Sequence, residues 1–193
     1  MRTKFGVREW TLDIGIIDDT IHQLDLGNNS KLLDIGTGAG IMAVSLALNE
    51  FDVLTGEPEG EEYEEHEGRE GYEYPDWREA AKAFGVEHKI RYQHFNAERL
   101  PFSTESFDGV FLYDTLHHIK NKERALSECL RVAKPKRVVC IIEVNENGNV
   151  YFREKYGFAH ETVVDPRDLI GGDDIVFELI SGEFSNAYVL RKI

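Results

Sequence analysis

A glycine-rich turn is the part of this sequence whose residue types point most clearly to chemistry. It runs from Asp34 to Gly40, as Asp-Ile-Gly-Thr-Gly-Ala-Gly, between an apolar segment at 31–35 and a helical pattern that begins at residue 41. Alternating glycines reach backbone conformations that other residues avoid, and they let a ligand lie against the main chain. The following helix would direct free N–H groups and the positive end of its dipole toward the turn. We therefore predict a binding loop here, although a tight turn between packed elements would use the same residues.

Glu57 is the second feature suited to ligand binding. It follows the apolar segment at 51–55 and lies 21 positions after Gly36. An acid about 20 residues beyond such a turn, at the tip of the next parallel strand, can accept hydrogen bonds from both hydroxyls of a ribose. The alternative is that Glu57 is only the first residue of an acidic stretch.

The acidic insertion covers residues 58–75 and has little apolar content. Positions 57 to 76 hold ten acids and one base, a large share of the net charge of -14. This composition is typical of a solvated loop. A flap over the binding cleft, with tyrosines covering a ligand and acids attracting a cationic substrate, is the alternative interpretation.

Length and composition narrow the class of protein. The 193 residues, 41% of them hydrophobic, suit one domain spanning 1–193. No apolar run approaches the ~20 residues of a membrane span and no secretory signal is visible, so we expect a soluble, cytoplasmic protein with no membrane partner. The acidic charge argues against nucleic acid as a partner. The two cysteines form no Cys-x-x-Cys pair, and we expect no metal site.

Hydrophobic patterning predicts an α/β fold. An N-terminal helical segment, 1–30, contains helical spacing between residues 10 and 26 and leads into the first strand. Strands and helices then alternate, which predicts a doubly wound, mostly parallel sheet. A closing antiparallel hairpin is expected from two apolar segments near the C-terminus. The predicted strands are 31–35, 51–55, 90–95, 109–113, 138–142, 175–180 and 187–190, and the predicted helices after the first are 41–49, 76–84 and 123–132.

Taken together, the motifs resemble those of class I S-adenosylmethionine-dependent methyltransferases. The glycine turn and Glu57 are followed by Asn96-Ala97 and then by Phe107-Asp108 and Leu116-His117-His118, and the likeness extends from about residue 31 to 142. It implies a Rossmann-like seven-stranded sheet, S-adenosyl-L-methionine as cofactor and S-adenosyl-L-homocysteine as product. The cofactor-binding residues that it implies are Asp34, Gly36, Thr37, Gly38, Gly40, Glu57, Asn96, Ala97 and Tyr113.

The resemblance also implies a role for several of these residues. Asp34 would hold the loop and, directly or through water, the ammonium group, and Glu57 would bind the ribose. The Asn96 side chain would accept from the adenine amino group, and the Ala97 N–H would donate to the ring. Tyr113 and Asp114, at the end of the fourth strand, would face the methionine end and the substrate.

Methyl transfer is an in-line displacement, so catalysis can come mainly from placing the acceptor at the methyl group in a dry pocket. An acceptor that must lose a proton needs a base, and the catalytic candidates are His117, Asp114 and Tyr113. The predicted function is methyl transfer to a small molecule.

Two other functions stay open at this point. One is a partner or regulatory protein that binds the cofactor without turnover. The other is an NAD(P)-dependent oxidoreductase, because Gly38-x-Gly40-x-x-Ala43 fits a looser dinucleotide fingerprint. S-adenosylmethionine has no pyrophosphate, however, and the acid at 34 together with Asn96-Ala97 fits it better. The acceptor and the oligomeric state are not determined by the sequence.

Overall fold

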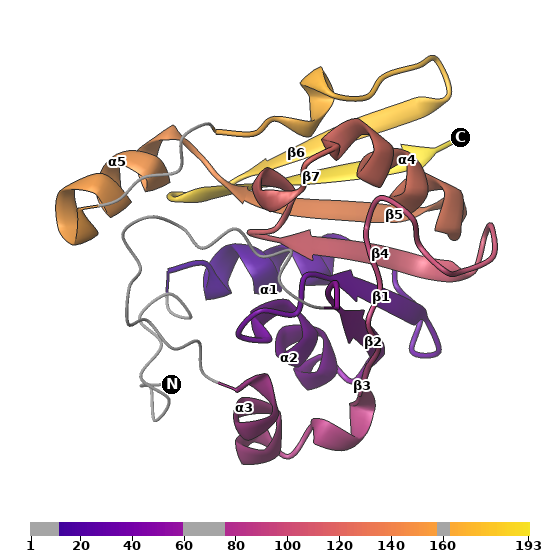
Figure 1. Ribbon diagram of the computed structural model, residues 1–193, viewed down its shortest axis with the longest axis horizontal. Coiled ribbons are helices and arrows are strands. Elements are labelled where there is room, and N and C mark those ends of the chain that lie inside the picture. The colour runs from indigo at the N-terminus through magenta and orange to yellow at the C-terminus, as the bar shows by residue number, and fades with distance from the viewer. Residues whose placement is uncertain (1–11, 60–75, 158–162) are drawn as a thin grey trace.

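The computed structural model of this chain describes residues 12–59, 76–157 and 163–193. These residues form a seven-stranded sheet in the order β3-β2-β1-β4-β5-β7-β6 (Figure 1). The first five strands in the chain pair in parallel, whereas β7 is antiparallel to both β5 and β6. The predicted α/β class and the closing hairpin are therefore confirmed. The strands are β1 Lys31–Ile35, β2 Asp52–Gly56, β3 Ile90–Tyr92, β4 Phe107–Tyr113, β5 Ala133–Val144, β6 Ile175–Ser181 and β7 Ser185–Lys192.

Five α-helices accompany the strands in the described ranges. They are α1 Ile14–Gln23, α2 Ile41–Leu48, α3 Trp77–Phe84, α4 Lys122–Val132 and α5 Glu146–Tyr156. Helix α3 begins and ends as its sequence predicts: Asp76 accepts a hydrogen bond from the Arg78 N–H, and Gly85 ends the helix in a left-handed conformation. Helix α1 is shorter than the predicted pattern, whose first two residues lie outside the described part of the chain. Most of the acidic insertion, from residue 60 onward, lies outside it as well.

Helix α5 was not predicted from the sequence. Its residues are mostly polar, and asparagine and Gly148 are weak helix formers, so the apolar spacing carries little signal. The cap residues are nevertheless present: the Asn145 side chain accepts from the Gly148 N–H, and Gly157 ends the helix at φ 79°. The helix follows the carboxyl end of β5, at the left of Figure 1.

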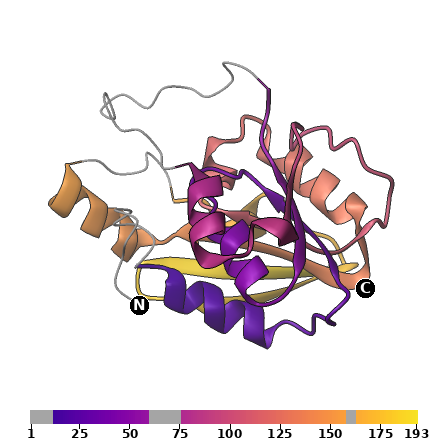
Figure 2. The same cartoon turned by 90° about the horizontal axis from the view of Figure 1, so that it is seen from below.

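The sheet is covered on both faces because apolar residues occupy both sides of its central strands. In β1, Leu32 packs with helices α1, α2 and α3, whereas Leu33 and Ile35 pack with helix α4. Figure 2 shows α1 and α4 on opposite sides of the sheet. Alternate residues of a strand point to opposite faces, so a strand buried on both sides is apolar throughout. This arrangement brings the carboxyl ends of β1, β2, β4 and β5 to one edge.

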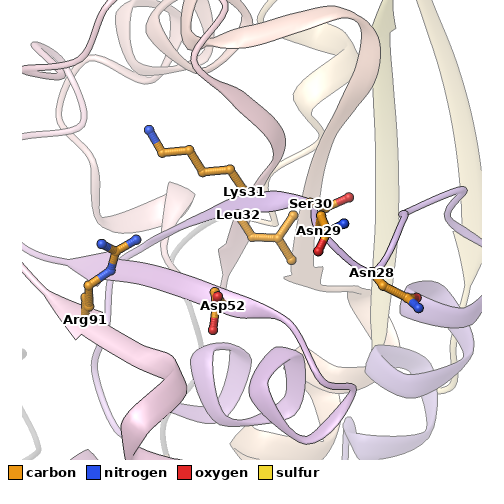
Figure 3. A pocket seen from close by; sticks show the side chains of 7 residues that line it. All are labelled: Asn28, Asn29, Ser30, Lys31, Leu32, Asp52 and Arg91. Carbon is orange, nitrogen blue, oxygen red and sulfur yellow. The ribbon is translucent and has the colours of Figure 1, made fainter.

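A pocket of about 180 Å³ lies at the opposite, amino edge of the sheet (Figure 3). It is lined by Asn28, Asn29, Ser30, Lys31, Leu32, Asp52 and Arg91. Ligands of open parallel sheets bind outside the carboxyl ends of the strands. This pocket is therefore not where the sequence motifs converge. Among the described helices, none is long and apolar enough to cross a membrane.

Candidate functional site

The glycine turn connects β1 to α2, and all three of its glycines have positive φ. The angles are 87° at Gly36, 45° at Gly38 and 77° at Gly40. A Cβ at Gly36 would lie 2.3 Å from the Thr115 hydroxyl oxygen, and one at Gly40 would lie 2.5 Å from the Trp77 Cβ. A Cβ at Gly38 would meet no atom of the described residues within 4 Å. Two of the glycines thus permit close packing, and Gly38 is the one beside open space.

Glu57 lies directly beside this open glycine. One carboxylate oxygen accepts from the Gly38 N–H at 3.3 Å, and the other accepts from the Tyr92 hydroxyl at 3.3 Å. The preceding residue, Gly56, has no room for a side chain, because a Cβ there would lie 1.9 Å from the Gln93 carbonyl oxygen. The end of β2 is therefore held close to the glycine turn, with the Glu57 carboxylate at the junction.

Asp34 is buried under the same turn. Its Oδ2 accepts from the Thr55 hydroxyl at 2.7 Å, and the Thr55 and Thr37 hydroxyls are 2.9 Å apart. Its Oδ1 is also buried and has no hydrogen-bond partner among the described residues. Burial raises the pKa of Asp34 to about 7; the Thr55 hydrogen bond lowers the pKa and the negative charge of Glu57 raises it. A cationic group reaching Oδ1 would stabilise the ionised form.

Asn96 and Ala97 lie in the loop after β3. The Asn96 side-chain oxygen accepts from the Glu98 N–H at 2.8 Å, and Ala97 is buried. The Phe95 N–H donates to the Glu57 carbonyl oxygen at 3.1 Å, which brings this loop beside the end of β2. An amide oxygen has two lone pairs, so Asn96 retains capacity to accept a second hydrogen bond.

Tyr113 and Asp114 form the carboxyl tip of β4. The Tyr113 hydroxyl donates to Asp13 Oδ2 at 2.9 Å, and the Ser185 hydroxyl donates to the same oxygen at 2.9 Å. Burial raises the pKa of Asp13, although these two hydrogen bonds lower it. Asp13 was not predicted from the sequence, because no pattern connects a residue before the first helix with the tip of β4. The Asp114 side chain is 42% exposed at the same edge.

His117 and His118 have different environments. The His117 side chain is 8% exposed, and its Nδ1 lies 2.7 Å from Glu143 Oε2 and 3.8 Å from Asp114 Oδ1. Burial lowers the pKa of His117, but the Glu143 hydrogen bond and the charges of Glu143 and Asp114 outweigh it and raise the pKa above its ordinary value. His118 is exposed. The structure therefore distinguishes the two histidines by their burial and contacts.

Glu143 is a buried acid that the sequence analysis overlooked. It lies near the end of β5, directly after the apolar segment 138–142, so the logic that identified Glu57 could have found it. Asp114, His117 and Glu143 offer oxygen and nitrogen atoms within 4.8 Å of one another, close enough to share a metal ion. Both Glu143 oxygens accept hydrogen bonds from protein donors, however, and these bonds account for the cluster.

The chain's sequence and fold match those of methyltransferases. A family model described as a methyltransferase domain matches residues 33–141. Demethylmenaquinone methyltransferase from Bacillus cytotoxicus is 30% identical over 138 residues, which cover 72% of this chain and 54% of that protein. The chain thus spans about half the length of this relative.

Solved structures share the fold at low sequence identity. A SAM-dependent methyltransferase from Aquifex aeolicus aligns with a TM-score of 0.60 and 15% identity, covering 92% of this chain and 89% of that one. The [4+2]-cyclase SpnF aligns with a TM-score of 0.53 and 22% identity, covering 67% of this chain and 44% of that one. With the family match over more than half of its length, the chain belongs to the methyltransferase domain family, in the class I S-adenosylmethionine-dependent group.

Proposed function

We propose that this chain binds S-adenosylmethionine across the glycine turn and transfers its methyl group to a small organic molecule. The observation that carries the proposal is the room at Gly38, where no described atom would lie within 4 Å of a Cβ, together with the Glu57 carboxylate bonded to its N–H and the buried Asp34 carboxylate at the start of the turn. Glu57 is expected to accept from the ribose hydroxyls, and the partnerless Asp34 oxygen is expected to accept from the ammonium group, directly or through water. When bound, the cofactor supplies an electrophilic methyl carbon on a positively charged sulfur.

The charge around the turn supports this cofactor over a dinucleotide. S-adenosylmethionine carries positive sulfonium and ammonium groups, which Asp34 and Glu57 attract. The pyrophosphate of NAD(P) would instead lie at the glycine turn, beside the Asp34 carboxylate, and unpaired like charges are repelled strongly where water is partly excluded. The oxidoreductase alternative therefore has less support than methyl transfer.

The residues at the tips of β4 and β5 are proposed to handle the acceptor. Asp114 is a partly exposed carboxylate there and is the better candidate to take a proton from the acceptor. His117 is less accessible for this role, because its Nδ1 bonds to Glu143 and its Nε2 is buried. A small-molecule acceptor is supported by the relative named for demethylmenaquinone. The fold alone does not establish methyl transfer, since one structural neighbour is named as a cyclase.

Calorimetry is the direct test of the proposal. We expect S-adenosylmethionine and S-adenosylhomocysteine to bind the purified chain and NAD⁺ and NADP⁺ not to bind. Transfer of a radiolabelled methyl group to a panel of small phenols, quinols, alcohols and amines then tests turnover. Binding without transfer to any acceptor would favour the partner or regulatory alternative, and no binding of either sulfur compound would exclude both.

A pair of glycine variants tests where the cofactor lies. Gly38 and Gly85 have positive φ, 45° and 73°, and within the described ranges no atom would lie within 4 Å of a Cβ at either. Alanine at either position should cost about 1 kcal/mol of folding stability through backbone strain. Only Gly38→Ala should also weaken S-adenosylmethionine binding, by about tenfold or more, because its methyl group would occupy the cofactor's space. Equal dissociation constants for the two variants would place the cofactor elsewhere.

A further inference from the structure

Glu143 joins the end of β5 to the loop that follows β4, at the carboxyl edge of the sheet. Its side chain is 1% exposed. Oε1 accepts from the backbone N–H groups of Thr115, at 3.1 Å, and Leu116, at 2.6 Å. Oε2 accepts from His117 Nδ1 at 2.7 Å. A buried carboxylate is stable only when such donors compensate for its lost hydration, and here both oxygens have them.

The loop at 114–118, which Glu143 holds, packs directly against the glycine turn. The Thr115 side chain occupies the space that a Cβ of Gly36 would need, with Thr115 Oγ1 2.3 Å from that position. Thr115 Oγ1 in turn donates to the Tyr113 carbonyl oxygen at 2.8 Å. Asp114, between them, adopts a left-handed φ of 48°, which costs a non-glycine residue about 1 kcal/mol or more. A strained loop in contact with a binding turn needs an anchor, and Glu143 is that anchor.

We propose that Glu143 is a positioning residue of the methyl-transfer site, which holds the loop at 114–118 against the glycine turn and holds the His117 ring in one orientation with its Nδ1 protonated. The inference rests on the proposed function, because it assigns Glu143 a role in shaping that site. Glu143 does this without touching the cofactor. Its influence passes through Thr115 to Gly36 on one side and through His117 on the other.

The charged groups around His117 agree with this arrangement. Burial lowers the pKa of His117, whereas the Glu143 hydrogen bond, the Glu143 charge and the Asp114 charge raise it and the Lys122 charge lowers it. The net shift is upward, so the ring is held as a cation over a wider pH range than a free histidine. Removing the Glu143 carboxylate therefore removes the two largest contributions that raise the pKa of His117.

The test uses Glu143→Gln and Glu143→Ala, with Glu146→Gln as the control. Glutamine keeps an oxygen for the two backbone donors but replaces the acceptor at His117 with an NH₂ group. Glu146 is an exposed acid three residues away, at the start of α5. Nuclear magnetic resonance titration reports the pKa and tautomer of His117, and calorimetry reports the dissociation constant for S-adenosylmethionine. We expect Glu143→Gln to lower the pKa of His117 by at least about one unit and to change cofactor affinity less than about threefold.

Glu143→Ala, where the variant remains folded, should shift His117 in the same way and also weaken cofactor binding by about fivefold or more, because two buried N–H groups lose their acceptor. An unchanged His117 titration in Glu143→Gln would overturn the proposal. So would a folded Glu143→Ala variant with wild-type cofactor affinity, or micromolar binding of Zn²⁺ or Mn²⁺ that Glu143→Gln abolishes. The His117 titration needs no cofactor, so failure of the proposed function would be recognised separately, by the wild-type protein not binding S-adenosylmethionine.

Discussion

Replacing Glu57 with alanine is expected to weaken S-adenosylmethionine binding by about tenfold or more. Hydrogen bonds to a charged group contribute roughly 1.5–3 kcal/mol each when shielded from water, and one lost bond at the lower end already corresponds to about tenfold. The carboxylate also accepts from the Gly38 N–H, so its removal loosens the turn that the cofactor is proposed to contact. Calorimetric dissociation constants of the wild-type and variant proteins measure the effect.

Two further variants separate the role of Glu57 from general effects of charge. Glu57→Gln keeps the size of the side chain and one acceptor oxygen. Its dissociation constant for S-adenosylmethionine should therefore lie between those of the wild type and Glu57→Ala. Glu87→Ala removes an exposed acid from the 3₁₀ turn before β3, near the opposite edge of the sheet, and should leave the dissociation constant unchanged. If Glu57→Ala binds as tightly as the wild type, the ribose assignment is wrong and Glu57 belongs functionally to the acidic insertion.

Replacing Asp34 with asparagine is expected to change both the pH dependence of stability and that of cofactor binding. Burial raises the pKa of Asp34 from 3.8 to about 7 in the folded chain. The folded state therefore holds a proton more tightly than the unfolded state does. This tighter proton binding stabilises the folded state. Its contribution to the free energy of unfolding is complete below pH 3.8 and is lost as the pH rises through about 7.

The asparagine variant lacks this titration. Between pH 5 and pH 8 the wild type should lose about 2–3 kcal/mol of unfolding free energy that the variant keeps, since each pKa unit corresponds to about 1.4 kcal/mol. Urea unfolding of both proteins at the two pH values measures the difference. An equal change with pH in both proteins would show that Asp34 does not titrate in this range.

Cofactor binding should respond in the opposite direction. If the ammonium group of S-adenosylmethionine interacts with ionised Asp34, binding to the wild type must strengthen as the pH rises through about 7. Asp34→Asn should bind more weakly at pH 8 and show a flatter pH dependence. A parallel pH dependence in the two proteins would remove Asp34 from the ammonium site. At pH 8 we therefore expect Asp34→Asn to be more stable than the wild type and to bind S-adenosylmethionine more weakly. Such a trade-off is typical of a binding site that contains a destabilising buried charge.

The sequence was most informative about local structure and about positions next to strand ends. Apolar segments predicted all seven strands, with differences only in their limits. The signal was clearest in central strands such as β1 and β4, because a strand buried on both faces leaves a continuous apolar segment. Asp76 and Gly85 marked the ends of α3 because caps have side-chain preferences that act locally. Glu57 could be placed beside the glycine turn because its spacing from that turn follows from the length of a strand–helix–strand unit, and the Gly38 N–H donates to its carboxylate. Helix α5 was not predicted because its formation depends on its capping residues and on packing beside β5, not on a periodic apolar pattern.

Only the tertiary structure decided which of these residues meet and what each one contacts. It distinguished Gly38, beside open space, from Gly36 and Gly40, which are glycines because Thr115 and Trp77 pack against them. It separated buried His117 from exposed His118, and it brought Asp13 and Glu143 to the tip of β4. These contacts join residues up to 172 positions apart. The sequence determined the fold and the glycine turn between β1 and α2, since both follow from local periodicity and spacing, whereas burial and long-range hydrogen bonding set the protonation and position of the side chains.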